Sequence, residues 1–317
     1  MSRLKTYATA DQFSGIREAN NYFVDKTEFL AELFRGGVKG KLLFTRPRRF
    51  GKSFMLSMVG DFLDISMKDK SPALFRDLKN MDHPDLVSRH MNQYPVIRMS
   101  WKDIYGETTS EVQEGLADQW ISAMLPYRQV IASSQLLTEK EKALFWEIFY
   151  GELEHDKLPY ELGFLVRLLY FHYNKDVVVL IDEYDMPLAR AYERDPDQKE
   201  LYPLVCDLVE RTLSSVCKPS GMVQAVILTG CMLTLNGSTA SGVNNIKPFT
   251  VTMPQYSQYF GFTEAEAEKI LKDAELLPYA SIVRDCYDGY LFAGPIFTVP
   301  GRFSTLSMTC STVTTRA

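Results

Sequence analysis

The chain has 317 residues, of which 46% are hydrophobic and 24% charged, a composition typical of a globular protein with room for one sizeable α/β domain and an appendage, or for two modest domains. The net charge of −5 provides no overall attraction to nucleic acid, and no apolar run approaches the roughly 20 residues that cross a bilayer. Because the first residues also lack a signal-peptide core, we expect a cytoplasmic location without a membrane segment.

The first predicted elements lie within residues 14–34, where an aromatic-rich turn precedes an apolar periodicity suited to a helix. Residues 41–53 follow with the sequence KLLFTRPRRFGKS, an apolar strand-like run that leads directly into Gly51, Lys52 and Ser53. A helix is predicted next, from about residue 53 to residue 65. A strand, a loop with these residues and a helix, in that order, are typical of a nucleotide phosphate site.

Each residue type in this loop has a separate chemical use. Gly51 lets the backbone approach the phosphates, Lys52 offers an ammonium to the β and γ oxygens, and Ser53 offers a hydroxyl to Mg²⁺. The helix that begins there aims its free N–H groups and its positive dipole end at the same anion. The standard P-loop pattern has glycine at position 46, where this chain has Arg46, and the Gly-Lys-Ser tripeptide alone is a weak signal.

The loop is also unusually basic, and a bound polyphosphate explains its local cluster of cations better than a DNA groove does. We therefore expect eight loop residues to contact the nucleotide: Arg46, Arg48, Arg49, Phe50, Gly51, Lys52, Ser53 and Phe54. Asp182 and Thr229, from two later segments, are expected to contact it as well.

The middle of the chain begins with a predicted strand at residues 95–101, where apolar and polar residues alternate. Residues 110–173 have helical spacing that is broken near Pro126 and Pro159. The large aromatic residues there, such as Trp120 and Trp146, are predicted to be core residues.

The second informative segment is residues 176–185, DVVVLIDEYD, in which a continuous apolar run ends at Asp182 and Glu183. Such a run predicts a strand buried on both faces, as in a parallel sheet. An acid at the end of this kind of strand holds Mg²⁺, and an adjacent glutamate polarises the attacking water. We assign Asp182 and Ser53 to Mg²⁺, and we assign Glu183 and Lys52 as catalytic residues. A solvated acidic loop is the alternative, but the pairing with the phosphate loop favours a nucleotide site.

Residues 187–217 are predicted to be helical with a surface break at DPDQKE, and residues 221–230 to form another buried strand whose exit carries Thr229. A short strand is predicted at residues 249–253. Residues 262–277 follow as a helix with Thr263 as its N-cap. Strands that alternate with helices imply a mostly parallel sheet with ligand loops at the carboxyl ends of the strands, which is where Thr229 and the two motifs fall.

The five cysteines are an odd number without CxxC spacing, and the four histidines lie far apart. Both observations argue against a disulfide framework and a zinc site. We expect reduced thiols and no metal other than Mg²⁺.

With these residues identified, the chain resembles the bacterial AAA-ATPase-like family, a P-loop group that typically carries a restriction-endonuclease-like nuclease domain after the ATPase portion. In that family the Arg-Pro-Arg-Arg loop is the normal form. The matching signatures occur in the family's order: YFVDKT (22–27), RPRRFGKS (46–53), LIDEYDMP (180–187), LTG (228–230), SGVNN (241–245), YFGFTEAE (259–266) and YDGY (287–290).

The resemblance implies an α/β fold, namely a P-loop NTPase three-layer sandwich of the AAA or a related additional-strand class, followed by a short helical lid region. It divides the chain into an ATPase-like domain at residues 1–260, a lid fragment at 261–296 and a tail at 297–317. It also supplies the choice of ATP as the nucleotide, and it suggests a homo-oligomer or a protein partner.

Two departures from the family pattern stand out. Leu233 and Asn236 occupy places where the family usually has basic residues, and the loss of a cation there is compatible with nucleotide binding but puts hydrolysis in question. Residues 298–317 contain nine Ser or Thr and no acid. Our hypothesis is that the reading frame is lost near Phe297 and the chain is truncated; a flexible tail is the alternative.

Three functions follow for comparison. The first is ATP binding with Mg²⁺-dependent hydrolysis, which the intact Asp182–Glu183 pair favours. The second is a nucleotide-gated interaction protein with little turnover, which the missing cations favour. A direct nucleic-acid enzyme has little support, because no further carboxylate pair stands at nuclease spacing.

Overall fold

The computed structural model describes residues 12–35, 39–152, 157–217, 221–233 and 246–282, and the backbone of two further strands at 288–291 and 296–298. The segments 234–245 and 299–317, with Asn236, the SGVNN signature and most of the predicted tail, lie outside the described residues. So do residues 283–287, which include the first tyrosine of YDGY.

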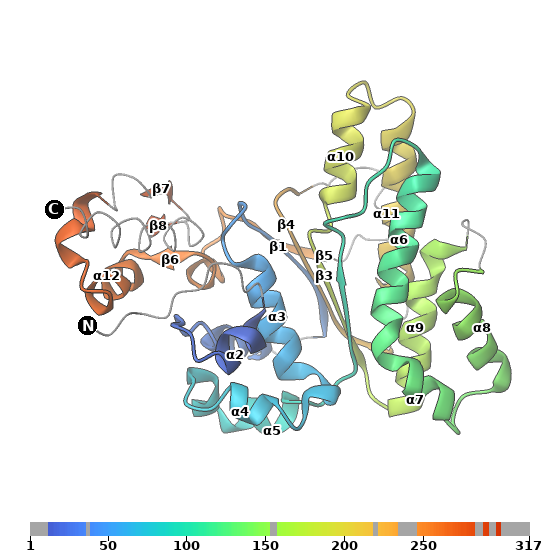
Figure 1. Ribbon diagram of the computed structural model, residues 1–317, viewed down its shortest axis with the longest axis horizontal. Coiled ribbons are helices and arrows are strands. Elements are labelled where there is room, and N and C mark those ends of the chain that lie inside the picture. Colours follow the sequence, from blue (N-terminus) through green and yellow to red (C-terminus); the bar gives the residue numbers. More distant parts are fainter. Residues whose placement is uncertain are drawn as a thin grey trace.

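A five-stranded parallel sheet forms the centre of the molecule, with the strand order β2-β3-β4-β1-β5 (Figure 1). The strand β4 lies between β1, which leads into the phosphate loop, and β3, which ends in the acidic residues. The predicted α/β P-loop fold with a mostly parallel sheet is thereby confirmed, including the additional strand. The five strands are β1 (Gly40–Thr45), β2 (Val96–Ser100), β3 (Val177–Asp182), β4 (Val223–Gly230) and β5 (Ile246–Phe249).

Helices cover both faces of this sheet, so that the domain has three layers. One face carries α1 (Phe13–Glu18), α2 (Glu28–Phe34), α3 (Lys52–Leu63), α4 (Ser71–Leu74) and α5 (Pro84–His90). The other carries α6 (Thr109–Met124), α7 (Arg128–Ser133), α8 (Glu139–Phe149), α9 (Leu158–Tyr173), α10 (Met186–Arg194) and α11 (Leu201–Cys217).

The side chains of β3 show why a continuous apolar run is needed in the central strands. Val177, Val179 and Ile181 belong to the apolar cluster on the α6–α11 side. Val178 and Leu180 belong to the cluster on the α3 side. All five are at most 1% exposed, so both faces of the strand are dry, as the sequence predicted.

Most predicted elements lie within a few residues of their positions in the structure. Pro126 separates α6 from α7, and Pro159 stands in the first turn of α9, where the missing N–H costs no hydrogen bond. The strand predicted at residues 249–253 is wrong in position, since β5 ends at Phe249. Pro248 is tolerated there because β5 is an edge strand that pairs with β1 alone.

Residues 261–296, which the sequence predicts to be a helical lid region, contain strands as well as a helix in their described parts. α12 (Glu264–Asp273) has Thr263 as its N-cap, as predicted from the sequence. The Thr263 hydroxyl accepts from the Glu266 amide, and the two residues form a capping box. A small antiparallel sheet accompanies it, with the order β6-β8-β7. Its strands are β6 (Phe262–Thr263), β7 (Asp288–Leu291) and β8 (Ile296–Thr298), so the start of the predicted tail belongs to a strand.

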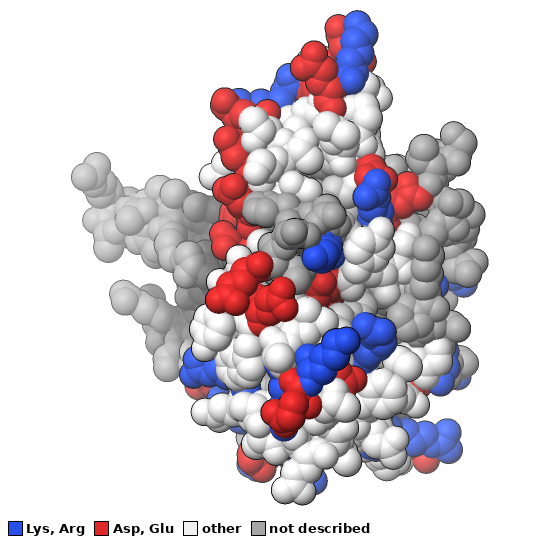
Figure 2. Space-filling view, turned by 90° about the vertical axis from the view of Figure 1, so that its right-hand side faces the viewer, with Lys and Arg blue, Asp and Glu red and all other residues white. Residues whose placement is uncertain are grey.

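Figure 2 shows the face formed by the helices on the α6–α11 side, where basic and acidic side chains are interspersed and the acidic ones gather along one edge. This face therefore presents mixed charge. Among the described residues, no helix has both the length and the apolar character needed to cross a membrane.

Candidate functional site

The phosphate loop connects β1 to α3 through two residues in the left-handed region. Arg49 has φ 69° and Gly51 has φ 75°. That conformation favours glycine, and at position 51 no atom would lie within 4 Å of an added β-carbon, so the backbone alone requires the glycine there. The turn ends at Lys52, where α3 begins, and leaves the first N–H groups of the helix directed at the loop.

Lys52 lies inside the loop and is 4% exposed. Its Nζ donates to the carbonyl oxygens of Arg46 and Pro47, at 3.1 Å each, and lies 3.4 Å from the Cys231 Sγ. The loop's own carbonyls thus hold the ammonium within the loop.

The three loop arginines do not act together, contrary to the sequence-based expectation. Arg48 and Arg49 are exposed, whereas Arg46 is fully buried. The Arg46 Nη1 donates to the carbonyls of Thr45 (2.8 Å) and Phe249 (2.7 Å), and its guanidinium carbon lies 4.8 Å from the centre of the Phe260 ring. Burial lowers the pKa of Arg46 to about 10. The contacts that the structure describes for Arg46 are all with the protein interior, so we correct its predicted role as a phosphate ligand.

The remaining loop residues differ in what they offer. Ser53 is half-buried on the first turn of α3. Phe50 is 1% exposed, and its carbonyl oxygen accepts from the Gly261 amide at 3.1 Å. Phe54 packs its ring against those of Phe13 and Phe23. The two phenylalanines therefore hold the loop against neighbouring segments, and Ser53 is the hydroxyl available to a metal.

The acidic end of β3 reaches the same edge of the sheet. Asp182 Oδ1 accepts hydrogen bonds from the Thr229 hydroxyl, in a short contact, and from the Glu183 amide at 3.0 Å. Thr229 is 2% exposed and pairs in register with Phe44, one residue before the end of β1. The strand β4 therefore brings the two predicted motifs together, and its Thr229 orients Asp182.

Glu183 is partly buried and has a strained backbone conformation. Its φ of 51° lies in the left-handed region, which is uncommon for a residue with a β-carbon. Burial raises its pKa, as does the carboxylate of Asp182, while the ammonium groups of Lys52 and Lys102 lower it. A carboxyl group with a raised pKa, near a lysine of the phosphate loop, suits a general base.

Sequence reasoning missed Asp185, which it treated only as a further acid of the loop. The Asp185 side chain is 1% exposed, and its Oδ2 accepts from the amides of Cys231 and Met232, at 2.8 Å each. The Tyr184 hydroxyl donates to the Met232 carbonyl at 2.8 Å. The acidic loop thus fixes the exit of β4, and the only signal in the sequence was a third acid after a buried strand.

The YFVDKT signature, residues 22–27, makes contacts with α12 that the sequence did not predict. Lys26 Nζ lies 2.6 Å from the carbonyl oxygen of Gln258 and 2.6 Å from Glu266 Oε2. The Tyr22 hydroxyl donates to Asp273 at 2.8 Å. This N-terminal segment therefore fastens α12 to the sheet domain.

Mg²⁺ usually takes one or two carboxylates together with phosphate oxygens and waters. Among the described residues no group of three or more His, Cys, Asp or Glu side chains is placed to hold a metal ion. Asp182 and Ser53 have the oxygen donors that Mg²⁺ prefers, and Thr229 orients one of the Asp182 oxygens. One carboxylate and one hydroxyl fit a Mg²⁺ ion whose other ligands are phosphate oxygens and waters.

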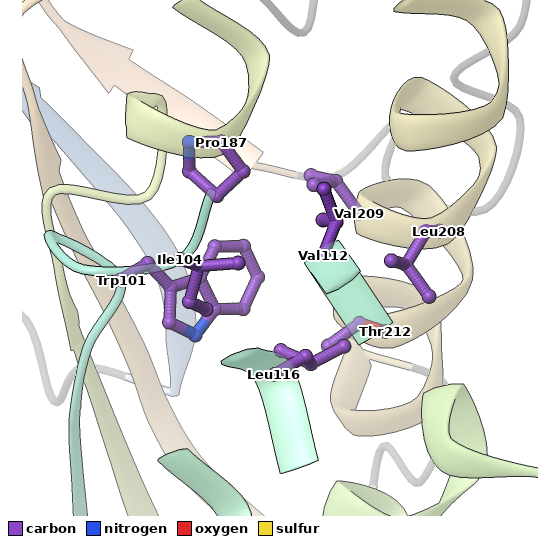
Figure 3. Close-up of a pocket in the computed structure, with 8 residues that line it drawn as sticks. All are labelled: Trp101, Ile104, Val112, Leu116, Pro187, Leu208, Val209 and Thr212. Carbon is purple, nitrogen blue, oxygen red and sulfur yellow. The ribbon is translucent and has the colours of Figure 1, made fainter. Parts of the chain in front are cut away.

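A small apolar pocket lies on the α6–α11 side, next to the acidic strand end (Figure 3). The Trp101 amide beside it donates to the Asp182 carbonyl at 2.9 Å. The Trp101 Nε1 and the Thr212 hydroxyl are buried, and neither has a hydrogen-bond partner in the described part of the chain. No charged side chain lines this pocket, so it does not suit a polyphosphate; it is lined by Trp101, Ile104, Val112, Leu116, Pro187, Leu208, Val209 and Thr212.

Comparisons with known proteins agree with this geometry. A family model described as Predicted AAA-ATPase matches residues 7–236. A curated relative from Azotobacter chroococcum mcd 1, described as an uncharacterized protein in the vnfD 5′ region, is 30% identical over 298 residues. The match covers 93% of this chain and 50% of the relative, so the chain spans about half the relative's length. No solved structure gives a significant match.

Proposed function

The chain belongs to the predicted AAA-ATPase-like family, and from this premise we propose that it binds ATP with Mg²⁺ and hydrolyses the nucleotide. The observation that carries the proposal is the position of Lys52. Its buried ammonium is held by two loop carbonyls, and its charge acts on Glu183 at the end of β3. One phosphate-binding cation and one base candidate therefore belong to a single site.

The proposed roles follow from the donors and acceptors present. Lys52 and the first amides of α3 bind the β and γ phosphates. Mg²⁺, when bound beside Ser53 and Asp182, would neutralise phosphate charge. Thr229 keeps Asp182 oriented, and Glu183 accepts a proton from the attacking water. Arg48 and Arg49 are exposed at the loop and supply further positive charge.

A second candidate function is a nucleotide-gated switch that binds ATP with little turnover. The exit of β4 favours it, because none of its described residues, 231–233, is basic. Leu233 packs against the apolar cluster on the α6–α11 side and supplies no charge to a transition state.

The proposal extends to the setting of the protein. We expect it to act in the cytoplasm and with a homo-oligomeric or other protein partner. The chain spans about half of its relative's length. The proposal therefore covers this chain alone and not an activity of the whole relative.

The test is equilibrium binding of ATP with Mg²⁺, followed by phosphate release on the same samples. Lys52→Ala should weaken binding by at least about tenfold, because a charge-assisted contact to phosphate is lost. Lys39→Ala is the matched control, since Lys39 is exposed, pairs with Asp176 and precedes β1. Binding with turnover by the unmodified protein supports the ATPase, and binding without turnover supports the switch. No binding by the folded protein rejects both.

A further inference from the structure

The two ends of the phosphate loop contact two adjacent residues, Phe260 and Gly261, where the lid region begins. At its start, the Arg46 guanidinium lies over the Phe260 ring, 4.8 Å from the ring centre. At its end, the Phe50 carbonyl accepts from the Gly261 amide at 3.1 Å. Gly261 has φ 75° and leads directly into β6 and α12. The loop and the entrance to the lid region therefore share one contact surface.

Within the described part of the chain, the Arg46 guanidinium is held there without an ion pair to a carboxylate. Its Nη1 bonds two carbonyls, those of Thr45 and Phe249, while Nε and Nη2 have no hydrogen-bond partner among the described residues. A buried cation with unmet donors is costly, and its position depends on the few groups that do contact it. A small displacement of any of them changes the stability of this arrangement.

The backbone of the same residue is in direct contact with Lys52. The Lys52 ammonium donates to the carbonyls of Arg46 and Pro47. When Lys52 turns toward a phosphate, these carbonyls lose their donor, and the backbone of residue 46 loses a restraint. The Arg46 side chain lies over the Phe260 ring and donates to the Phe249 carbonyl.

We propose that Arg46 is a positioning residue that couples nucleotide occupancy of the loop to the position of the lid region, through Phe260 and Gly261. The inference rests on the proposed function, because it requires the loop to bind a nucleotide. It assigns Arg46 a task different from that of Arg48 and Arg49, which are exposed on the same loop.

The experiment measures amide hydrogen exchange in residues 257–273, with and without saturating ATP and Mg²⁺. In the unmodified protein the nucleotide should change the exchange rate there by about threefold or more. Arg46→Met, which keeps an apolar stem but no donor, should lose most of that response, with an ATP Kd within about threefold of the unmodified value. Arg48→Met, which removes a cation from the same loop, should keep the response at saturating ATP.

Several outcomes would overturn the inference. A full lid response in Arg46→Met would show that the side chain carries no coupling, and a Kd raised as far as in Lys52→Ala would make Arg46 a phosphate ligand. ATP binding without any lid response in the unmodified protein would reject the inference alone, whereas no ATP binding would reject the proposed function and the inference with it. If Arg46→Met does not fold, Phe260→Leu serves as the second variant, because it removes the ring face beneath the guanidinium. A full hydrogen-exchange response to ATP in Phe260→Leu would equally reject the coupling.

Discussion

Asp185 and Gly230 lie so close together that a β-carbon on residue 230 would come within 2.6 Å of the Asp185 Oδ1. The same β-carbon would lie 2.7 Å from the Tyr184 ring. The Gly230 carbonyl meanwhile accepts from the Arg46 amide at 3.0 Å. Gly230 is thus the point at which the acidic loop and the phosphate loop pack against the end of β4.

We expect Gly230→Ala to destabilise the protein by about 1–3 kcal/mol, because a methyl group in a closed space displaces the acidic loop. Denaturant unfolding followed by circular dichroism measures the change. Gly15→Ala is the matched control, since residue 15 is exposed in α1 and has no atom within 4 Å of an added β-carbon. That control should be neutral or slightly stabilising. Equal stabilities of Gly230→Ala and the unmodified protein would contradict the packing described here.

Glu183→Gln should retain ATP affinity and lose hydrolysis by about 100-fold or more, because the amide cannot accept the water proton. The pH dependence follows from the raised pKa of Glu183. A base acts only when deprotonated, so turnover is present above this pKa and falls as the pH decreases through it. The fall should begin at a higher pH than for an ordinary glutamate.

Phosphate release measured across pH, with ATP saturating, tests this expectation. Asp182→Asn separates the two acids, because it should mainly raise the Mg²⁺ concentration needed for activity. Unchanged turnover in Glu183→Gln would remove the residue from catalysis and leave the nucleotide site itself standing.

Lys26→Met should loosen α12 from the sheet domain. The pair with Glu266 joins a lysine side chain that is 8% exposed to a carboxylate that is 26% exposed, and the same lysine contacts the Gln258 carbonyl. Loss of these contacts should cost about 1–3 kcal/mol, read out as faster proteolysis or hydrogen exchange in α12. Arg211→Met is the control, because its pair with Asp207 is half-exposed on α11 and is worth about 0.5 kcal/mol at most. A similar small effect of both changes would show that Lys26 does not fasten the helix.

Glu161 gives a stability prediction with a defined pH range. Burial raises the pKa of Glu161 to about 7, and Arg167 opposes the shift. The Glu161 Oε2 is buried and has no hydrogen-bond partner among the residues that the structure describes. The folded protein therefore holds this proton more tightly than the unfolded chain, and the stability from this group is lost as the pH rises from about 4.5 to about 7.

Glu161→Gln removes this ionisation, so its advantage over the unmodified protein should grow between pH 5 and pH 8. We expect a gain on the order of 1–2 kcal/mol, reduced by the partial exposure of the group. Denaturant unfolding at both pH values tests it, with Glu193→Gln at an exposed position of α10 as the control. A constant difference between the two pH values would rule out the proposed ionisation.

Local sequence was sufficient for the elements that carry the site. The β3 run is apolar at every position because both of its faces are covered, and the loop before α3 has the residue types that phosphate binding requires. Thr263 predicted the start of α12, because an N-cap contact is made within one turn of the helix. The strand at β5 was misplaced because an edge strand with Pro248 has little pattern of its own.

The sequence by itself therefore determined the parallel α/β fold, the phosphate loop and the acidic pair, since each depends on residues that are neighbours in the chain. Only the tertiary structure decided that Arg46 is buried under Phe260 while Arg48 is exposed, and that Asp185 holds the amides after β4. The physical reason is that desolvation and long-range hydrogen bonds depend on what packs around a side chain. The residues that cover Arg46 are Phe249 and Phe260, about 200 residues away in the sequence. No pattern in the sequence around Arg46 predicts these contacts.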